Sequence, residues 1–63
     1  MKYHSDLLIV TGRQVRANGR CLRDDSLTSK GVALVELGLE ALKNEGRMIE
    51  VPKELESFLV KPE

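Results

Sequence analysis

The chain has 63 residues, 41% of them hydrophobic, and its ten basic and ten acidic side chains cancel to a formal net charge of zero. A chain of this length has room for one domain, 1–63, and buries only about 60% of the surface that its unfolded form exposes. One cysteine and one histidine exclude a disulfide framework and a clustered zinc site, so we expect no metal and no cofactor, and oligomerisation remains as the added source of stability.

The sequence predicts a cytoplasmic location. Cys21 has no cysteine partner in the chain, which is typical of a reducing compartment. No stretch approaches the roughly 20 consecutive apolar residues of a membrane span. The first ten residues also lack the apolar core of a signal peptide, so we expect no membrane contact.

The zero net charge hides a split between the two ends of the chain. Residues 1–23 hold five basic side chains and one acidic side chain, a charge of +4, whereas residues 24–63 hold five basic and nine acidic side chains, a charge of −4. Such asymmetry predicts either a site for a polyanion at the basic end or an electrostatic association of the two ends.

The first expected element is a buried strand at Ser5–Thr11. Its centre, LLIV at 7–10, is a short apolar run with two β-branched members. A run of this length and composition between polar residues favours a strand over a helix.

A β-hairpin is expected at 12–23. Asn18-Gly19 is the strongest short-range signal for a two-residue hairpin turn. A rival interpretation stays open, because TGRQ at 11–14 fits a helical capping box and Gly19 fits a helix C-cap. It predicts a short helix at 12–18 in place of the hairpin.

The central expected element is an amphipathic helix from Thr28 to Asn44 or Glu45. Thr28 fits its N-cap, and Gly46 fits a left-handed C-cap. Helical spacing places its apolar side chains in two neighbouring rows, so this helix needs partners on two sides. The first row is Val32, Val35, Leu39 and Leu42, and the second is Leu34, Leu37, Gly38 and Ala41.

Gly31 and Gly38 lie seven residues apart on one face of this helix, which predicts that another backbone approaches closely there. The neighbour is either another element of the same fold or a symmetry-related copy of the helix. Because the apolar surface exceeds what one small sheet and one short helix cover, we expect a homodimer. The expected dimer contact is Gly31, Leu34, Gly38 and Ala41.

A short helix is expected near the end of the chain. Residues 47–51 form a short extended piece, and Pro52 fits the first position of a helix that continues to Val60. Leu55, Phe58 and Leu59 form its apolar face. The expected fold is therefore α+β, with an N-terminal strand and a β-hairpin packed on one long central helix, followed by a short C-terminal helix.

No pair of residues forms a credible catalytic constellation. His4 is a lone histidine, and Cys21 has no histidine near it in the sequence to activate its thiol. The glycines form neither a phosphate-binding loop nor a dinucleotide fingerprint. We therefore expect a protein that is not an enzyme and takes no small-molecule substrate.

The functional prediction depends on four arginines, Arg13, Arg16, Arg20 and Arg23. They fall within eleven residues around the expected hairpin turn. A two-stranded ribbon can lie along a groove of duplex DNA with arginines on phosphates and base edges. The alternative is a hairpin whose arginines are only solvated.

Residues 20–42, RCLRDDSLTSKGVALVELGLEAL, resemble the opening of winged-helix domains in phage-type replication initiators and replisome organisers. In those domains a strand and an acidic loop lead into the first helix, and GRMIEVPKELESFLV at 46–60 is similar to the second helix. The resemblance implies a small phage or prophage regulatory or accessory protein that binds DNA. The second hypothesis is a homodimeric protein-interaction module with no nucleic-acid role, and the salt dependence of binding separates the two.

Overall fold

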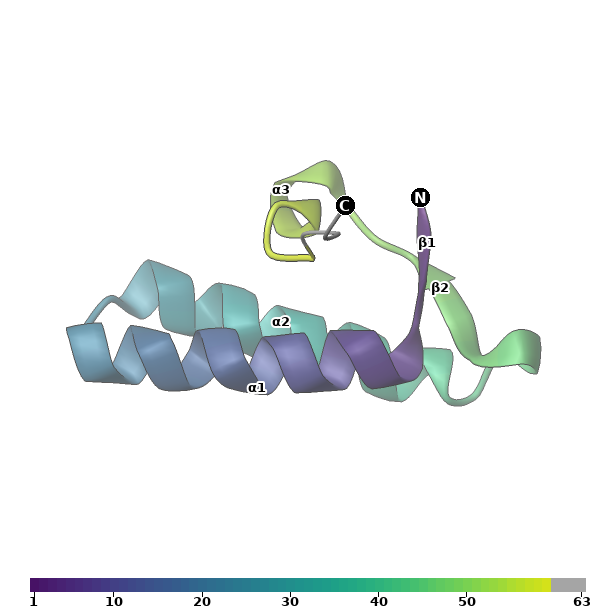
Figure 1. The fold of residues 1–63 in the computed structure, drawn as a ribbon, viewed down its shortest axis with the longest axis horizontal. Coiled ribbons are helices and arrows are strands. Elements are labelled where there is room, and N and C mark those ends of the chain that lie inside the picture. Colours follow the sequence, from purple (N-terminus) through teal and green to yellow (C-terminus); the bar gives the residue numbers. More distant parts are fainter. Residues whose placement is uncertain (60–63) are drawn as a thin grey trace.

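The computed structural model describes residues 1–59 as a pair of long helices covered on one side by two short strands and a third helix (Figure 1). The class is α+β, as the sequence predicts. The last helix ends at Glu56 and is therefore shorter than predicted, and its expected end at Val60 lies outside the described residues. The elements in chain order are β1 Lys2–His4, α1 Ser5–Leu22, α2 Asp25–Ala41, the short 3₁₀ helix η1 Glu45–Arg47, β2 Met48–Glu50 and α3 Lys53–Glu56.

The predicted strand at 5–11 and the predicted β-hairpin at 12–23 are both wrong, because the two segments form the single helix α1. The rival helix at 12–18 lies within α1. Gly19 is not in a turn but buried in this helix against α2. The turn signal of Asn18-Gly19 is local, and it is overridden because a helix brings the small residues of α1 that are spaced by seven, such as Gly12 and Gly19, to α2 along one line.

The backbones of α1 and α2 pack in direct contact at glycines. A Cβ atom built on Gly12 falls 2.6 Å from the Val35 nitrogen, and one built on Gly31 falls 2.3 Å from the Arg16 nitrogen. Real Cβ atoms essentially never lie under 3.0 Å from such neighbours, so any larger residue would push the helices apart. The close approach predicted at Gly31 and Gly38 is therefore made within one chain, by α1.

Two residues join the antiparallel helices. Arg23 adopts the left-handed conformation with a φ of 57°, and its N–H group donates to carbonyl groups in the last turn of α1. The Asp24 carboxylate then caps α2 by accepting a hydrogen bond from the Leu27 N–H at 3.1 Å. Asp24 is thus the N-cap in place of Thr28, whose hydroxyl donates to the Asp24 carbonyl oxygen at 2.9 Å from inside the helix.

The far end of α2 also differs from the prediction. The helix ends at Ala41, before the expected end at Asn44 or Glu45. Gly46 has the expected positive φ, 80°, but it lies inside η1 and not directly after α2. The Asn44 side chain donates to the Met48 carbonyl oxygen at 3.0 Å, which connects this bend to the start of β2.

The core lies between the helical pair and the layer made by the strands and α3. β1 pairs antiparallel with β2, with Tyr3 opposite Ile49, so the extended segment predicted at 47–51 is confirmed while the N-terminal strand is shorter and earlier than expected. Pro52 lies at the start of α3, as its N-cap and not at the predicted first helical position, and Phe58 packs against the core. The buried core residues are Tyr3, Leu8, Val15, Leu34, Val51, Leu55 and Leu59.

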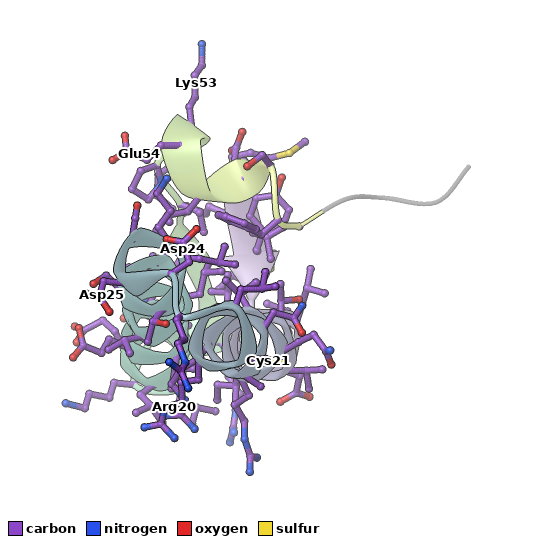
Figure 2. The ribbon with its side chains drawn as sticks, turned by 90° about the vertical axis from the view of Figure 1, so that its left-hand side faces the viewer. Arg20, Cys21, Asp24, Asp25, Lys53 and Glu54 are labelled. Carbon is purple, nitrogen blue, oxygen red and sulfur yellow. The ribbon has the colours of Figure 1, made fainter. Side chains whose placement is uncertain are left out.

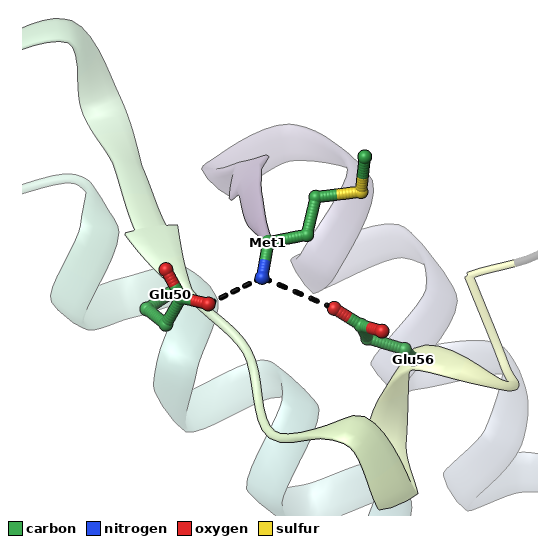
Figure 3. A network of polar contacts seen from close by, with 3 residues as sticks. All are labelled: Met1, Glu50 and Glu56. Atoms are coloured by element: carbon green, nitrogen blue, oxygen red, sulfur yellow. Dashed lines mark hydrogen bonds and ion pairs between the residues drawn. The ribbon is translucent and has the colours of Figure 1, made fainter.

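The amine of Met1 connects β2 to α3. It bonds to the Glu50 carboxylate at the end of β2 and lies 3.3 Å from an oxygen of Glu56 in α3 (Figure 3). The hydrogen bond to Glu50 is the main cause that raises the pKa of this amine above its ordinary value of 8.0, and Glu56 acts in the same direction. The two acidic side chains thus hold the first residue against the strand and helix layer.

Candidate functional site

Three of the four candidate arginines share one face of α1. Arg13, Arg16 and Arg20 are separated by three and four residues, a spacing that forms one row along a helix. Because the backbone of Arg16 lies against Gly31, this row borders α2. The structure therefore brings these three side chains together, although on a helix and not on the expected β-hairpin.

The arginine row faces away from the strand and helix layer. Figure 2 shows Arg20 on the side of the helical pair opposite to Lys53 and Glu54 of α3. Arg13 and Arg20 are exposed, and Arg16 is half-buried. Within residues 1–59 the ion pairs involve only the Met1 amine and His4, so no carboxylate of this range pairs with these guanidinium groups.

Arg23 is placed apart from the row. It is exposed in the turn between α1 and α2, where its backbone is left-handed. Its side chain therefore does not continue the helical spacing of Arg13, Arg16 and Arg20. The structure supports a three-residue arginine row with a fourth arginine at its end.

An apolar row of α2 lies on the same side of the helical pair as the arginine row. Val32, Val35, Leu39 and Leu42 have the helical spacing predicted from the sequence, but this row is not packed into the core. Val32, Leu39 and Leu42 are 37%, 50% and 37% exposed. The part of the chain that the structure describes places no element over them (Figure 1).

Two side chains join the apolar row to α1 across the glycines. The Ile9 Cγ1 atom lies 2.5 Å from a Cβ built on Gly38, and the Val35 Cγ2 atom lies 2.7 Å from one built on Gly12. Ile9 is also in helical register with the arginines, four residues before Arg13. We therefore define the open face as Ile9, Arg13, Arg16 and Arg20 of α1 with Val32, Val35, Leu39 and Leu42 of α2.

The residues expected at a dimer contact do not belong to the open face. Leu34 and Ala41 are completely buried in the core of one chain, and Gly31 and Gly38 face α1. A second copy could reach these four residues only by separating α1 from α2. The expected contact residues are therefore corrected, because one chain already buries them, while the homodimer itself stays a prediction.

Sequence reasoning missed the open face because it placed the arginines on a different element from the apolar row. A signal for the correct arrangement was present. Ser5, Gly12 and Gly19 recur every seven residues, as do Gly31 and Gly38, and such matched spacing is typical of two helices in close contact. Once those small residues face one another, the arginine row and the apolar row must lie on the same side.

The described residues hold no catalytic or metal-binding arrangement. His4 Nδ1 accepts a hydrogen bond from the Asp6 N–H at 3.1 Å, Cys21 is an exposed thiol, and no three potential metal ligands gather anywhere in residues 1–59. An open cleft of about 410 Å³ separates α2 from α3. Its lining is mainly apolar, with two carboxylates at its rim: Ala33, Glu36, Leu37, Glu40, Pro52 and Leu55.

Comparison of the chain with protein-family models, with curated proteins and with solved structures finds no match. The resemblance to winged-helix domains therefore stays a prediction. Among the described helices, none has the length and apolar character that crossing a membrane requires.

Proposed function

We propose that this protein is a small interaction module that binds an α-helical protein segment on its open face. The main observation behind the proposal is that the apolar row of α2, with exposed Leu39 in it, lies directly beside the arginine row of α1, which is unpaired within residues 1–59. An amphipathic helix bound in a groove between helices is recognised by apolar anchors at helical spacing. A bound helix would cover the apolar row of α2 and present carboxylates to α1.

The exposed apolar row supports a partner with an apolar protein surface over a polar partner such as DNA. Scattered exposed aliphatic residues are normal, but a row of four at helical spacing on one face is not a scattered set. Covering Val32, Leu39 and Leu42 contributes favourably because apolar area leaves water. The arginines then select for an acidic partner, since like-charged segments would be repelled.

A second candidate function is the binding of duplex DNA by Arg13, Arg16, Arg20 and Arg23. The specific observation in its favour is that none of these guanidinium groups pairs with a carboxylate within residues 1–59. The resemblance to phage-type winged-helix domains points the same way and implies a regulatory or accessory role. This candidate leaves the apolar row without a role, and no aromatic residue stands among the arginines for base stacking.

A pair of binding measurements tests the proposal. One probe is a synthetic amphipathic peptide helix with a leucine stripe flanked by glutamates, and the other is a mixed-sequence DNA duplex. We expect the peptide to bind with a weak dependence on salt, whereas contacts with phosphates would give affinity that falls steeply as salt rises. Salt-sensitive binding of the duplex together with no binding of the peptide would establish the second candidate instead.

Matched variants locate the binding surface. Leu39→Asp places a charge in the apolar row and should abolish peptide binding. Leu22→Asp makes the same change at a residue that is 69% exposed but outside the open face, and it should leave peptide binding unchanged. Circular dichroism of both variants checks that each is folded. Equal loss of binding in the two variants would contradict the assignment of this face.

A further inference from the structure

We infer that the open face binds a second copy of itself, so that two helical pairs stack into a four-helix arrangement. This inference rests on the proposed function and names its partner. The first support is that the two halves of the open face differ in character: the α1 half is basic, and the α2 half is apolar. The two halves can therefore complement each other across two copies in a way that a uniform face could not.

The α2 half also carries acidic side chains beside its apolar row. Asp25 and Glu36 are both exposed and lie eleven residues apart, a spacing that brings them to the same side of α2. Glu36 follows Val35 and precedes the row's Leu39 by three residues. Carboxylates thus border the apolar row on the side away from α1, where Glu36 also lies at the rim of the cleft between α2 and α3. Within residues 1–59 neither carboxylate takes part in an ion pair.

One symmetry operation joins the complementary halves. A two-fold axis that runs parallel to the helices, in the plane of the open face, places α1 of each copy over α2 of the other. A two-fold axis perpendicular to the helices would place α1 over α1 and bring the two arginine rows together. Like charges that face each other across an interface cost binding free energy, so the parallel axis is favoured.

The heights of the residues along the two helix axes, their levels, agree with this arrangement. Gly19 lies beside Thr28 and Gly12 beside Val35, so Arg13 is level with Leu34, and Arg20 with Leu27. Glu36 and Asp25 are each two residues from these levels, an offset of about 3 Å along the axis. A parallel two-fold axis keeps every residue at its level.

The same levels set the contacts between copies. Arg13 therefore meets Glu36 of the second copy, and Arg20 meets Asp25 of the second copy, each within reach of a long guanidinium side chain. At the other end of the face Ile9 is level with Gly38 and meets Leu39 of the second copy. The stacked pair thus has an apolar end and a charged end.

Arg16 is the residue that this arrangement favours least. It lies between the two helices of each pair, beside Gly31, so the symmetry brings the two Arg16 side chains nearest to the axis. Their aliphatic stems can cover the apolar row while the charged groups extend towards water. Replacement by leucine removes the two like charges, so Arg16→Leu should tighten the association rather than weaken it.

Sedimentation velocity over a concentration series tests the inference through a charge exchange. We expect Arg13→Glu and Glu36→Arg each to weaken dimer formation by about tenfold, because each change reverses two symmetric ion pairs. The double variant R13E/E36R should recover most of the wild-type affinity, since the pairs reform with opposite sense. Glu54→Arg is the control, because it makes the same charge change at an exposed residue of α3, on the side of the molecule opposite to Arg20 (Figure 2), and should leave dimer formation unchanged.

Two outcomes would overturn the inference. One is a wild-type protein that sediments as a monomer at every concentration, and the other is a double variant that associates no better than the single variants. If the wild type is a monomer but still binds the acidic peptide helix in a way that Leu39→Asp abolishes, only the second copy is excluded as partner. If the peptide does not bind either, the proposed function fails with it.

Discussion

Gly31 of α2 lies so close to Arg16 of α1 that a Cβ atom built on the glycine falls 2.3 Å from the Arg16 backbone nitrogen and 2.7 Å from its Cα. Backbone atoms cannot move aside as the end of a flexible side chain can. The spacing of the two long helices is therefore set at this point, and with it the geometry of the open face.

Replacement of Gly31 by alanine should destabilise the fold by about 1 to 3 kcal/mol or more, because an overpacked contact forces the helices apart. This outweighs the gain of up to about 1 kcal/mol that alanine brings to a helix interior. Urea unfolding followed by circular dichroism measures the difference. Gly46→Ala is the control, since no atom lies within 4 Å of its added Cβ, and its cost of about 1 to 2 kcal/mol comes only from the positive φ. A Gly31→Ala protein as stable as the wild type would show that the helices can separate freely.

Ser5→Ala should leave stability unchanged or raise it by about 1 kcal/mol. Ser5 is fully buried at the start of α1, and its hydroxyl oxygen has no hydrogen-bond partner among the described residues. A buried polar group without a partner carries a desolvation cost that alanine removes. Thermal unfolding compares this variant with Ser29→Ala, an exposed change in α2 that should have little effect. A clear loss of stability in Ser5→Ala alone would indicate that the hydroxyl group is bonded in solution.

Asp24→Ala should cost about 1 kcal/mol because it removes the N-cap of α2. The Asp24 carboxylate accepts from the Leu27 N–H at 3.1 Å, and alanine leaves that amide without a side-chain acceptor. Asp25→Ala is the matched control: it removes the same carboxylate one residue later, where within one chain only the interaction with the helix dipole is lost. Denaturant unfolding of both variants should show the larger loss for Asp24. Equal losses would show that Asp24 stabilises α2 only through its charge and not through the hydrogen bond to the Leu27 N–H.

The Met1 amine should make stability depend on pH in the alkaline range. Its pKa is raised in the folded chain, chiefly by the hydrogen bond to Glu50, so the contact contributes fully below the ordinary value of 8.0 and is lost as pH rises through the folded pKa. Unfolding measured across this range in the wild type and in a Glu50→Gln, Glu56→Gln double variant isolates the contribution. We expect the two proteins to converge in stability at high pH. A difference that stays constant with pH would assign the effect to packing.

Several elements could be predicted from the sequence because their signals are local and agree with their packing. Pro52 precedes a short helix that contains the buried Leu55, Leu59 is buried just after this helix, and the apolar piece at 47–51 contains a strand. The spacing of Gly31 and Gly38 correctly indicated a close backbone. It did not indicate which backbone, because a row of glycines shows only that some element packs closely against the helix.

Tertiary structure decided the rest, beginning with residues 5–23. Their local signals, an apolar run and an Asn18-Gly19 pair, favour strands and a turn, but α1 forms because its small residues match those of α2 over several turns. That match is non-local, so no window of the sequence contains it.

The contact between α1 and α2 also decided where the arginines and the apolar row of α2 lie. With one side of the helical pair packed on α3 and the strands, Arg13, Arg16 and Arg20 came to lie beside Val32, Val35, Leu39 and Leu42 on the other side. The sequence by itself determined the two apolar rows of α2, whereas the arginine row of α1 became visible only once residues 5–22 were known to be a helix. Only the packing of the glycines determined which row is buried and which is exposed, because burial depends on the face that the second helix covers.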